Sequence, residues 1–360
     1  MRRFTSILLI SMISSMSWMS LVALAVPTCS GSNVVPPADR APLPATARGP
    51  EIPAKGYLVE EVQDRLYWVT DGIYNAMFLV YQDEKSPAGG GVIAVDAPPT
   101  IGERYLKAIA EVAPGKPVTH LVYTHSHTDH IGGASLFPQG ITILAHQETA
   151  ETLARRNDPR RPMPTVTVDR TYTLQVGDQT LLLEYKGPNH EPGNLFVYAP
   201  RQKVLMLVDV IYPGWVPYKN LGIAKDVPDY ISAHDHALTY PFETLVAGHV
   251  NRLGTRDDVV ISREFVLDLK AAGERALRTV DFAASARETG TEDKWHLYET
   301  YFKKVVQTVY DDVRPRWRNR LGGADTYLYD NCWVMCESLV VDFAPTPEAP
   351  IPPGDAGQRR

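Results

Sequence analysis

Short runs of apolar and β-branched residues alternate with helical patterns from residue 57 to about residue 255. Runs such as AMFLVYQ (76–82) and GVIAVDA (91–97) are bounded by turn residues, which is typical of strands, whereas IGERYLKAIAEVA (101–113) has helical spacing. Further strands are expected over 57–62, 66–71, 118–125, 140–146, 171–177, 179–187, 194–200, 202–209 and 243–249, and further helices over 147–156 and 227–239. The alternation predicts an α/β layered protein whose sheets contain hairpins and are not purely parallel.

Beyond Thr255 the pattern changes to long amphipathic helices, expected over residues 257–288, 291–317 and 325–343. We therefore expect an α/β domain over residues 56–255, a helical region over 256–345 and a disordered tail over 346–360. The helical region is expected to pack on the α/β domain or to pair two subunits as a homodimer. Cys332 and Cys336 lie four residues apart, so one helix face would bury both as free thiols. A disulfide or a metal pair is the less favoured interpretation.

The first 55 residues lack these patterns. Arg2 and Arg3 precede an apolar run that ends at Ala23-Leu24-Ala25, which predicts a signal peptide over residues 1–25 rather than an uncleaved membrane anchor. Residues 26–55 are rich in Pro and Ala and are expected to form an extended tether. We therefore expect export to the periplasm or the exterior. Lipidation at Cys29 is not favoured, because Thr28 precedes it instead of a small residue.

Composition limits the class of partner. The 360 residues carry a formal net charge of -6, and 44% of them are hydrophobic. This supports a large buried core and gives no basic surface for nucleic acid. A small-molecule substrate is the expected partner, with no membrane contact beyond a possible N-terminal anchor.

The sequence THSHTDHIGG (124–133) places four potential metal ligands directly after a predicted strand. On the irregular turn there, His125 and His127 can converge on one ion, whereas on a regular helix residues two apart would diverge. Asp129 and His130 can reach a second ion beside the first. Other predicted strand ends supply three more potential ligands: His190, Asp209 and His249.

The pattern HxHxDH, followed by His190, Asp209 and a Gly-His at His249, resembles the metallo-β-lactamase-fold hydrolase superfamily across residues 57–255. The resemblance implies that this catalytic domain is a four-layered αβ/βα sandwich with its site along one edge, and that Asp96 lies buried behind the metal loop. It implies a first metal held by His125, His127 and His190, and a second held by Asp129, His130 and His249. Asp209 would bridge the two metals.

This ligand set favours two divalent ions, with Zn²⁺ preferred, because neutral imidazoles suit zinc and carboxylates offset the charge of the ions. A hydroxide bridging the metals would be the nucleophile, since metal binding lowers the pKa of water from about 15.7 to about 7. Asp129 would orient it and then carry a proton to the leaving group. Metal-dependent hydrolysis is therefore the expected reaction.

The substrate is less constrained. Metallo-β-lactamases proper typically have Cys or Ser where this chain has Asp209, so a small ester or lactone is favoured. Tyr212 lies three residues after Asp209, an arrangement similar to that of the acyl-homoserine lactonases, and this resemblance implies that its phenol stabilises an oxyanion. Alternatively, Tyr212 only lines an apolar pocket together with Trp215 and Tyr218. The alternatives are an exported class B-like β-lactamase and a metal-stabilised binding protein without activity. Three further histidines lie outside this set. His146 follows a predicted strand and is either a structural residue or a support for the metal ligands, whereas His234 and His236 are interpreted as surface or packing residues.

Overall fold

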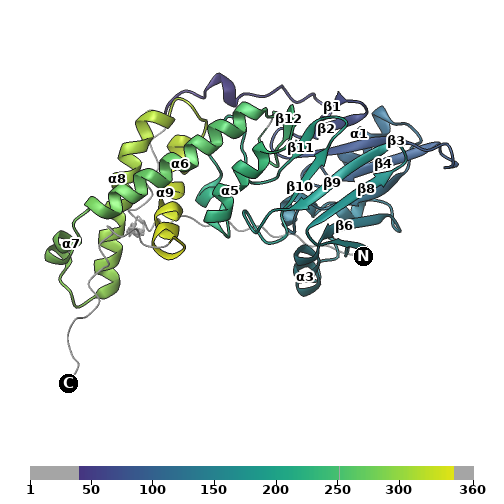
Figure 1. The fold of residues 1–360 in the computed structure, drawn as a ribbon. Helices are drawn as coiled ribbons and strands as arrows, with labels where there is room; N and C mark the ends of the chain where they lie inside the picture. Colours follow the sequence, from purple (N-terminus) through teal and green to yellow (C-terminus); the bar gives the residue numbers. More distant parts are fainter. Residues whose placement is uncertain (1–39, 251, 344–360) are drawn as a thin grey trace, which may run out of the picture. The chain divides into compact units, whose positions relative to one another are not determined.

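Two β-sheets lie face to face in the computed structural model, which describes residues 40–250 and 252–343 (Figure 1). The first sheet has the order β1 (Leu58–Gln63), β2 (Leu66–Thr70), β3 (Asn75–Gln82), β4 (Gly90–Val95), β5 (Val118–Val122), β6 (Thr142–His146), β7 (Val166–Val168). The second has the order β12 (Thr244–Val246), β11 (Val204–Met206), β10 (Leu195–Ala199), β9 (Gln179–Tyr185), β8 (Thr171–Val176). Both sheets mix antiparallel with parallel pairs, which confirms the prediction of mixed sheets.

Alternation along the central strands creates two separate cores. In β3, Met77 and Leu79 face the second sheet, where they join Leu181 and Val197, whereas Phe78 faces the opposite side. Because successive strand residues point to opposite faces, β3, which is apolar from Ala76 to Val80, is buried on both sides.

Helices cover the outer face of each sheet. On the first sheet lie α1 (Glu103–Val112), the short α2 (Thr128–Ile131), the short 3₁₀ turn η3 (Ala134–Leu136) and α3 (Gln147–Arg156). On the second lies α5 (Val227–Leu238), whose Tyr230 and Ala233 share a core with Phe196 and Leu205. The predicted αβ/βα four-layered sandwich is therefore confirmed.

The C-terminal region consists of α6 (Arg256–Thr279), α7 (Phe282–Thr289), α8 (Lys294–Trp317) and α9 (Ala324–Val341). Helix α6 packs on α5, and α8 and α9 pack on α6, so these helices extend the core of the second sheet. The prediction of one continuous helix over 257–288 is wrong. Val280 is extended (φ -73, ψ 121), and Asp281 caps α7 by accepting a hydrogen bond from the Ala283 amide.

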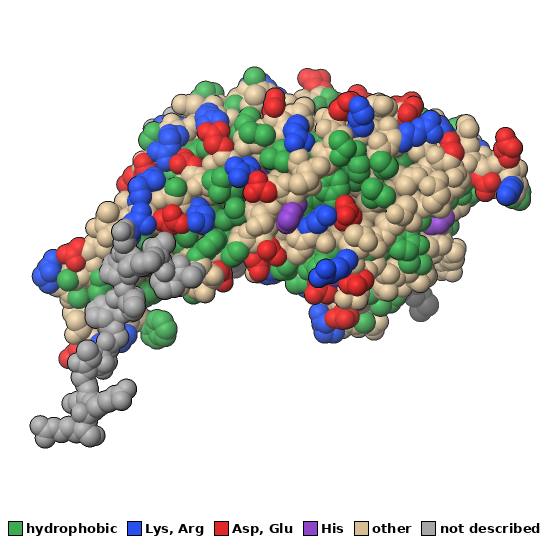
Figure 2. Space-filling view, viewed as in Figure 1, with side chains coloured by type: hydrophobic (Ala, Val, Ile, Leu, Met, Phe, Trp, Pro, Cys, Tyr) green, Lys and Arg blue, Asp and Glu red, His purple; other side chains and the backbone are tan. Residues whose placement is uncertain are grey.

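Cys332 and Cys336 are both buried and unbridged on α9, as predicted. On the face shown in Figure 2, Lys and Arg side chains are interspersed with Asp and Glu side chains over the helical region. Within the helical region, Arg316 pairs with Asp268 at 2.9 Å. A homodimer through these helices remains a prediction.

The described part of the expected tether, residues 40–55, contacts the folded domain. It contains a 3₁₀ turn, η2 (Ala45–Ala47), and its carbonyls accept hydrogen bonds from Trp215 Nε1 (2.9 Å) and Arg252 Nε (2.6 Å). The expected signal peptide, Cys29 and the tail over 346–360 lie outside the described residues. Within the described ranges, no helix combines the length and apolarity needed to cross a membrane.

Candidate metal centre

Seven side chains gather where strands of both sheets end. His125, His127, His190 and Asp209 form one group, and Asp129, His130 and His249 form another. Within each group the potential ligand atoms lie within 4.8 Å of one another. The structure thus brings together every residue that the sequence nominates as a ligand, although their role as ligands remains a prediction.

The carboxylate of Asp209 lies between the two groups. Its Oδ2 is 3.3 Å from His190 Nε2 and 3.2 Å from His130 Nε2. Its Oδ1 is 3.1 Å from His249 Nε2. One carboxylate therefore contacts both groups, as a bridging ligand must.

The histidine nitrogens converge as metal ligands do. His127 Nδ1 lies 2.9 Å from His190 Nε2, and His130 Nε2 lies 3.1 Å from His249 Nε2. The buried Nε2 of His125 has no hydrogen-bond partner among the described residues. A buried nitrogen normally has a partner, so this arrangement is costly unless a cation occupies the space. Imidazole and carboxylate donors in this number suit zinc and related divalent ions.

The electrostatics give His125, His190 and Asp209 the protonation states that metal binding needs, whereas His130 holds a proton that a metal would displace. Burial lowers the pKa of His190 to about 4 and that of His125 well below its usual value, so both imidazoles are neutral at pH 7. Burial opposes ionisation of Asp209, but His130, His249 and His190 outweigh it and hold its pKa well below the usual range. For His130, burial opposes protonation, but the charge and hydrogen bond of Asp209, together with the charges of Asp129 and Asp96, outweigh burial and raise its pKa to about 9. The centre therefore attracts positive charge.

Asp96 supports the metal loop from behind, as the resemblance implies. It is fully buried, and its two oxygens accept hydrogen bonds from the Thr124 amide (2.8 Å) and hydroxyl (2.7 Å). The Thr124 hydroxyl also lies 3.0 Å from His125 Nδ1, which orients that ring. Burial raises the pKa of Asp96 to about 7, although His130 and the Thr124 hydrogen bonds act against this rise.

Glu191 is a site residue that the sequence analysis missed. Its Oε2 lies 2.9 Å from His127 Nε2, and its Oε1 accepts a 2.6 Å hydrogen bond from the Ser126 amide. With Nε2 held by Glu191, the Nδ1 of His127 faces His190. A glutamate directly after a candidate ligand was the available signal.

Tyr74 and Asn75 were also missed. The Tyr74 ring packs on His249 with centroids 4.6 Å apart, and its hydroxyl lies 3.5 Å from Asp129 Oδ2. Burial, followed by the charge of Asp129, raises the pKa of Tyr74 to about 12. The buried Asn75 amide donates to the backbone carbonyls of His249 (3.2 Å) and Val250 (2.7 Å). These residues fix the loop that carries His249.

Tyr212 stands beside the second group. Its ring stacks on His249 with centroids 5.9 Å apart, and it lines a cavity of about 410 Å³ that also includes Trp215 and Tyr218. Burial and the charge of Asp209 hold the pKa of its phenol well above the usual value, so the hydroxyl stays protonated and can donate. A role in oxyanion stabilisation remains a prediction.

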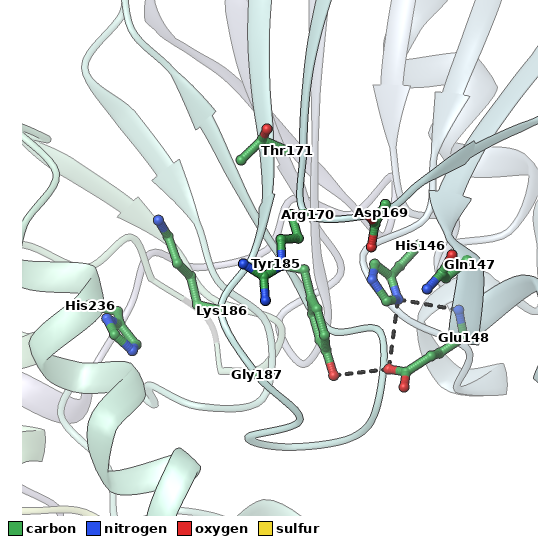
Figure 3. Close-up of a pocket in the computed structure, with 10 residues that line it drawn as sticks. All are labelled: His146, Gln147, Glu148, Asp169, Arg170, Thr171, Tyr185, Lys186, Gly187 and His236. Carbon is green, nitrogen blue, oxygen red and sulfur yellow. Dashed lines mark hydrogen bonds and ion pairs between the residues drawn. The ribbon is translucent and has the colours of Figure 1, made fainter.

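The other three histidines lie outside both groups. His146 Nδ1 accepts a 3.2 Å hydrogen bond from the Glu148 amide at the start of α3, and its ring packs on Tyr185. Both line a separate cavity of about 550 Å³, with His236 across it (Figure 3). His234 is buried, with Nε2 3.0 Å from Ser262 Oγ on α6. The contacts of His146 and His234 support a structural interpretation of these two residues.

Comparison with known proteins agrees with this architecture. The family model described as the metallo-beta-lactamase superfamily matches residues 76–249, and this part of the chain belongs to that superfamily. Over 207 residues the chain is 32% identical to the 2,4-dinitroanisole O-demethylase subunit alpha of Nocardioides sp. (strain JS1661). The aligned region covers 55% of this chain and 59% of the Nocardioides subunit.

Two further matches are described as metallo-beta-lactamases. The metallo-beta-lactamase type 2 of Elizabethkingia meningoseptica is 28% identical over 200 residues, covering 53% of this chain and 78% of its own length. A solved metallo-beta-lactamase from Pontibacter korlensis matches with a TM-score of 0.49 and 22% identity, covering 58% of this chain and 97% of its own.

Proposed function

We propose that this protein is a metal-dependent hydrolase that opens a small ester or lactone. The observation that carries the proposal is the carboxylate of Asp209, which contacts His190 and His130 at once and so ties two converging histidine groups together. Superfamily membership of residues 76–249 supports the same reaction class.

Two divalent ions, with Zn²⁺ favoured, would supply an activated water nucleophile and polarise the carbonyl of the substrate. The first would be held by His125, His127 and His190, the second by Asp129, His130 and His249, and both by Asp209. The carboxylate of Asp129 is 43% exposed, and it can carry a proton to the leaving group. The protonated phenol of Tyr212 can donate to the developing oxyanion.

The cavity beside His249 favours neutral substrates. Among the described residues, no Lys, Arg, Asp or Glu lines it, so the side chains of this lining offer no charged partner to a carboxylate-bearing lactam. Opening of a lactam is the second candidate, favoured by the similarity to the Elizabethkingia enzyme. The name of the Nocardioides relative includes 2,4-dinitroanisole, an aryl methyl ether, so aryl methyl ethers belong in the same substrate test.

A substrate panel tests the proposal. Protein expressed with zinc is assayed on phenyl acetate, a homoserine lactone, nitrocefin and 2,4-dinitroanisole, and its metal content is measured. We expect turnover of phenyl acetate or the lactone, loss of most activity in Asp209→Ala, and normal activity in Asp235→Ala, whose side chain is exposed and pairs with Arg263. Rapid opening of nitrocefin with inert esters and lactones would overturn the proposed substrate class. Fewer than about one metal ion per chain would overturn the metal centre.

We also propose that the protein is exported. The charged and apolar pattern of residues 1–25 supports this location. N-terminal sequencing of the mature protein tests it, and an intact Met1 in material from the cytoplasm would contradict it.

A further inference from the structure

The cavity beside the metal centre is lined by residues of the α/β domain and of the C-terminal helical region. His249 and Tyr212 form its inner wall, next to the second group of potential ligands. Trp215 and Tyr218 follow Tyr212 in the same loop. Gly323, Thr326 and Tyr327, at the start of α9 in the C-terminal helical region, also line the cavity.

Aromatic and apolar groups dominate this lining. Tyr218 and Tyr327 meet across the two parts of the chain, with ring centroids 5.0 Å apart at an interplanar angle of 66°. Tyr218 is 47% exposed and Ile73 is 62% exposed, so apolar surface is presented where a substrate can reach it. Lys219, which follows Tyr218 in the chain, pairs with Asp330 at 3.9 Å. A neutral ring fits such walls, because aromatic pairs favour stacked and edge-to-face contacts.

Helix α9 also holds the loop that carries Trp215 and Tyr218. The Oδ1 atom of the fully buried Asn331 accepts a 2.7 Å hydrogen bond from the Leu221 amide, and its Nδ2 donates to the Pro217 carbonyl at 3.0 Å. Between these anchors the loop makes a left-handed turn, α4 (Lys219–Ile223), in which Asn220 and Leu221 have φ values of 56° and 54°. Non-glycine residues rarely adopt this conformation unless their surroundings impose it.

Backbone contacts add a second attachment. The Val216 amide donates to the Gly322 carbonyl at 3.0 Å, and the Gly322 amide donates to the Gly214 carbonyl at 2.9 Å. A Cβ at Gly322 would lie 2.8 Å from the Trp215 ring, so only glycine allows this approach. The loop and the start of α9 thus form one unit.

We infer that the C-terminal helical region completes the substrate pocket, and that this pocket takes a neutral aromatic group of the substrate next to the reacting bond. The part of this inference that concerns the reacting bond rests on the proposed hydrolase function. The binding of an aromatic group does not depend on that function. Tyr327 and Tyr218 are the residues that contact the ring, and Asn331 is a positioning residue.

The kinetic test compares phenyl acetate with ethyl acetate, which shares the reacting bond but has no ring. Tyr327→Ala and Tyr218→Ala should each lower the ratio of kcat/KM for phenyl acetate over ethyl acetate at least fivefold, mainly through KM. Tyr172→Ala, which removes an exposed tyrosine from β8 outside this cavity, should leave both the activity and the ratio unchanged. An unchanged ratio in both pocket variants would overturn the inference.

A binding test separates this inference from the proposed function. Acetanilide, a neutral aromatic amide shaped like phenyl acetate, is followed by saturation-transfer NMR against N-methylacetamide. We expect saturation of its ring protons in the native protein and in Tyr172→Ala, with Kd raised at least fivefold in Tyr218→Ala. If no ester is hydrolysed but this pattern holds, the pocket stands and the hydrolase proposal fails. Equal binding of both amides, or unchanged Kd in the variant, would refute the pocket.

Discussion

Glu191 offers the sharpest test of how the first group of ligands is positioned. Its carboxylate contacts His127 Nε2 at 2.9 Å and accepts from the Ser126 amide at 2.6 Å, so it fixes both the ring and the backbone of the metal loop. Burial opposes its ionisation, but the hydrogen bond and charge of His127 outweigh burial and lower the pKa of Glu191. Glu191 is therefore an anion at pH 7 that holds the Nε2 proton of His127 and leaves Nδ1 available to a metal.

Glu191→Gln keeps the shape and one oxygen but removes the charge. The amide still accepts from Ser126, while the charge-assisted bond to His127, roughly twice as strong as a neutral one, is lost. Residues that orient a metal ligand typically contribute about 10- to 100-fold in metal affinity. We therefore expect zinc affinity to fall by that factor, equivalent to about 1.4–2.8 kcal/mol.

Chelator-competition titration with Zn²⁺ at about pH 7.5 measures this loss directly, without any substrate. Glu148→Gln is the matched control, because Glu148 accepts from Tyr185 in the separate cavity of Figure 3 and contacts neither group of ligands. We expect native affinity in the control. A zinc affinity for Glu191→Gln within about threefold of the native protein would show that Glu191 does not orient His127, and the reasoning would fail.

Three further outcomes are expected. Asn331→Ala leaves the buried Leu221 amide and Pro217 carbonyl without their partner, so urea unfolding should show a loss of about 2 kcal/mol or more; no loss would mean that the loop is held otherwise. Burial lowers the pKa of His234 to about 4. Below about pH 6.5 the unfolded chain therefore binds more protons at this residue than the folded chain does, so the stability contributed by neutral His234 is lost as the pH falls. Between about pH 7 and pH 5, the native protein should lose about 2 kcal/mol more than His234→Gln, measured by denaturant unfolding, and parallel curves would contradict this. Removing metal with a chelator should lower the thermal midpoint and re-adding zinc should restore it, because a ligand at 100 times its Kd stabilises by about 2.7 kcal/mol; an unchanged midpoint would argue against a metal centre.

The sequence predicted the elements whose patterns depend only on neighbouring residues. The helix over 147–156 is α3 to the residue, and the strand over 76–82 is β3 with one residue added. The strand expected over 202–209 ends earlier, at Met206, and the chain reaches Asp209 in a left-handed conformation with φ 61°. Periodicity cannot show such a turn, because it records which face is buried and not the local backbone angles.

The nominated ligands could be found because each is a strong donor at a strand end, whereas their supports could not. Glu191, Asn75 and Asn331 act through partners 50 or more residues away, and nothing beside them in the sequence indicates those partners. The break at Val280 was missed for a related reason, since the apolar spacing continues across it while Asp281 starts a new helix. Long-range packing decides these features.

The division of the centre between the sheets also explains why these supports are needed. His125 and His127 come from the loop after β5 in the first sheet, whereas His190 and Asp209 come from loops of the second. A shift of one sheet over the other would separate the donors, so contacts that cross between the sheets set the geometry. Asn75 on β3 donates to the His249 loop after β12, and Glu191 binds the Ser126 amide of the first sheet's loop. The same two contacts therefore join the sheets and position the ligands, which is why losing either should disturb metal binding before it unfolds the sandwich.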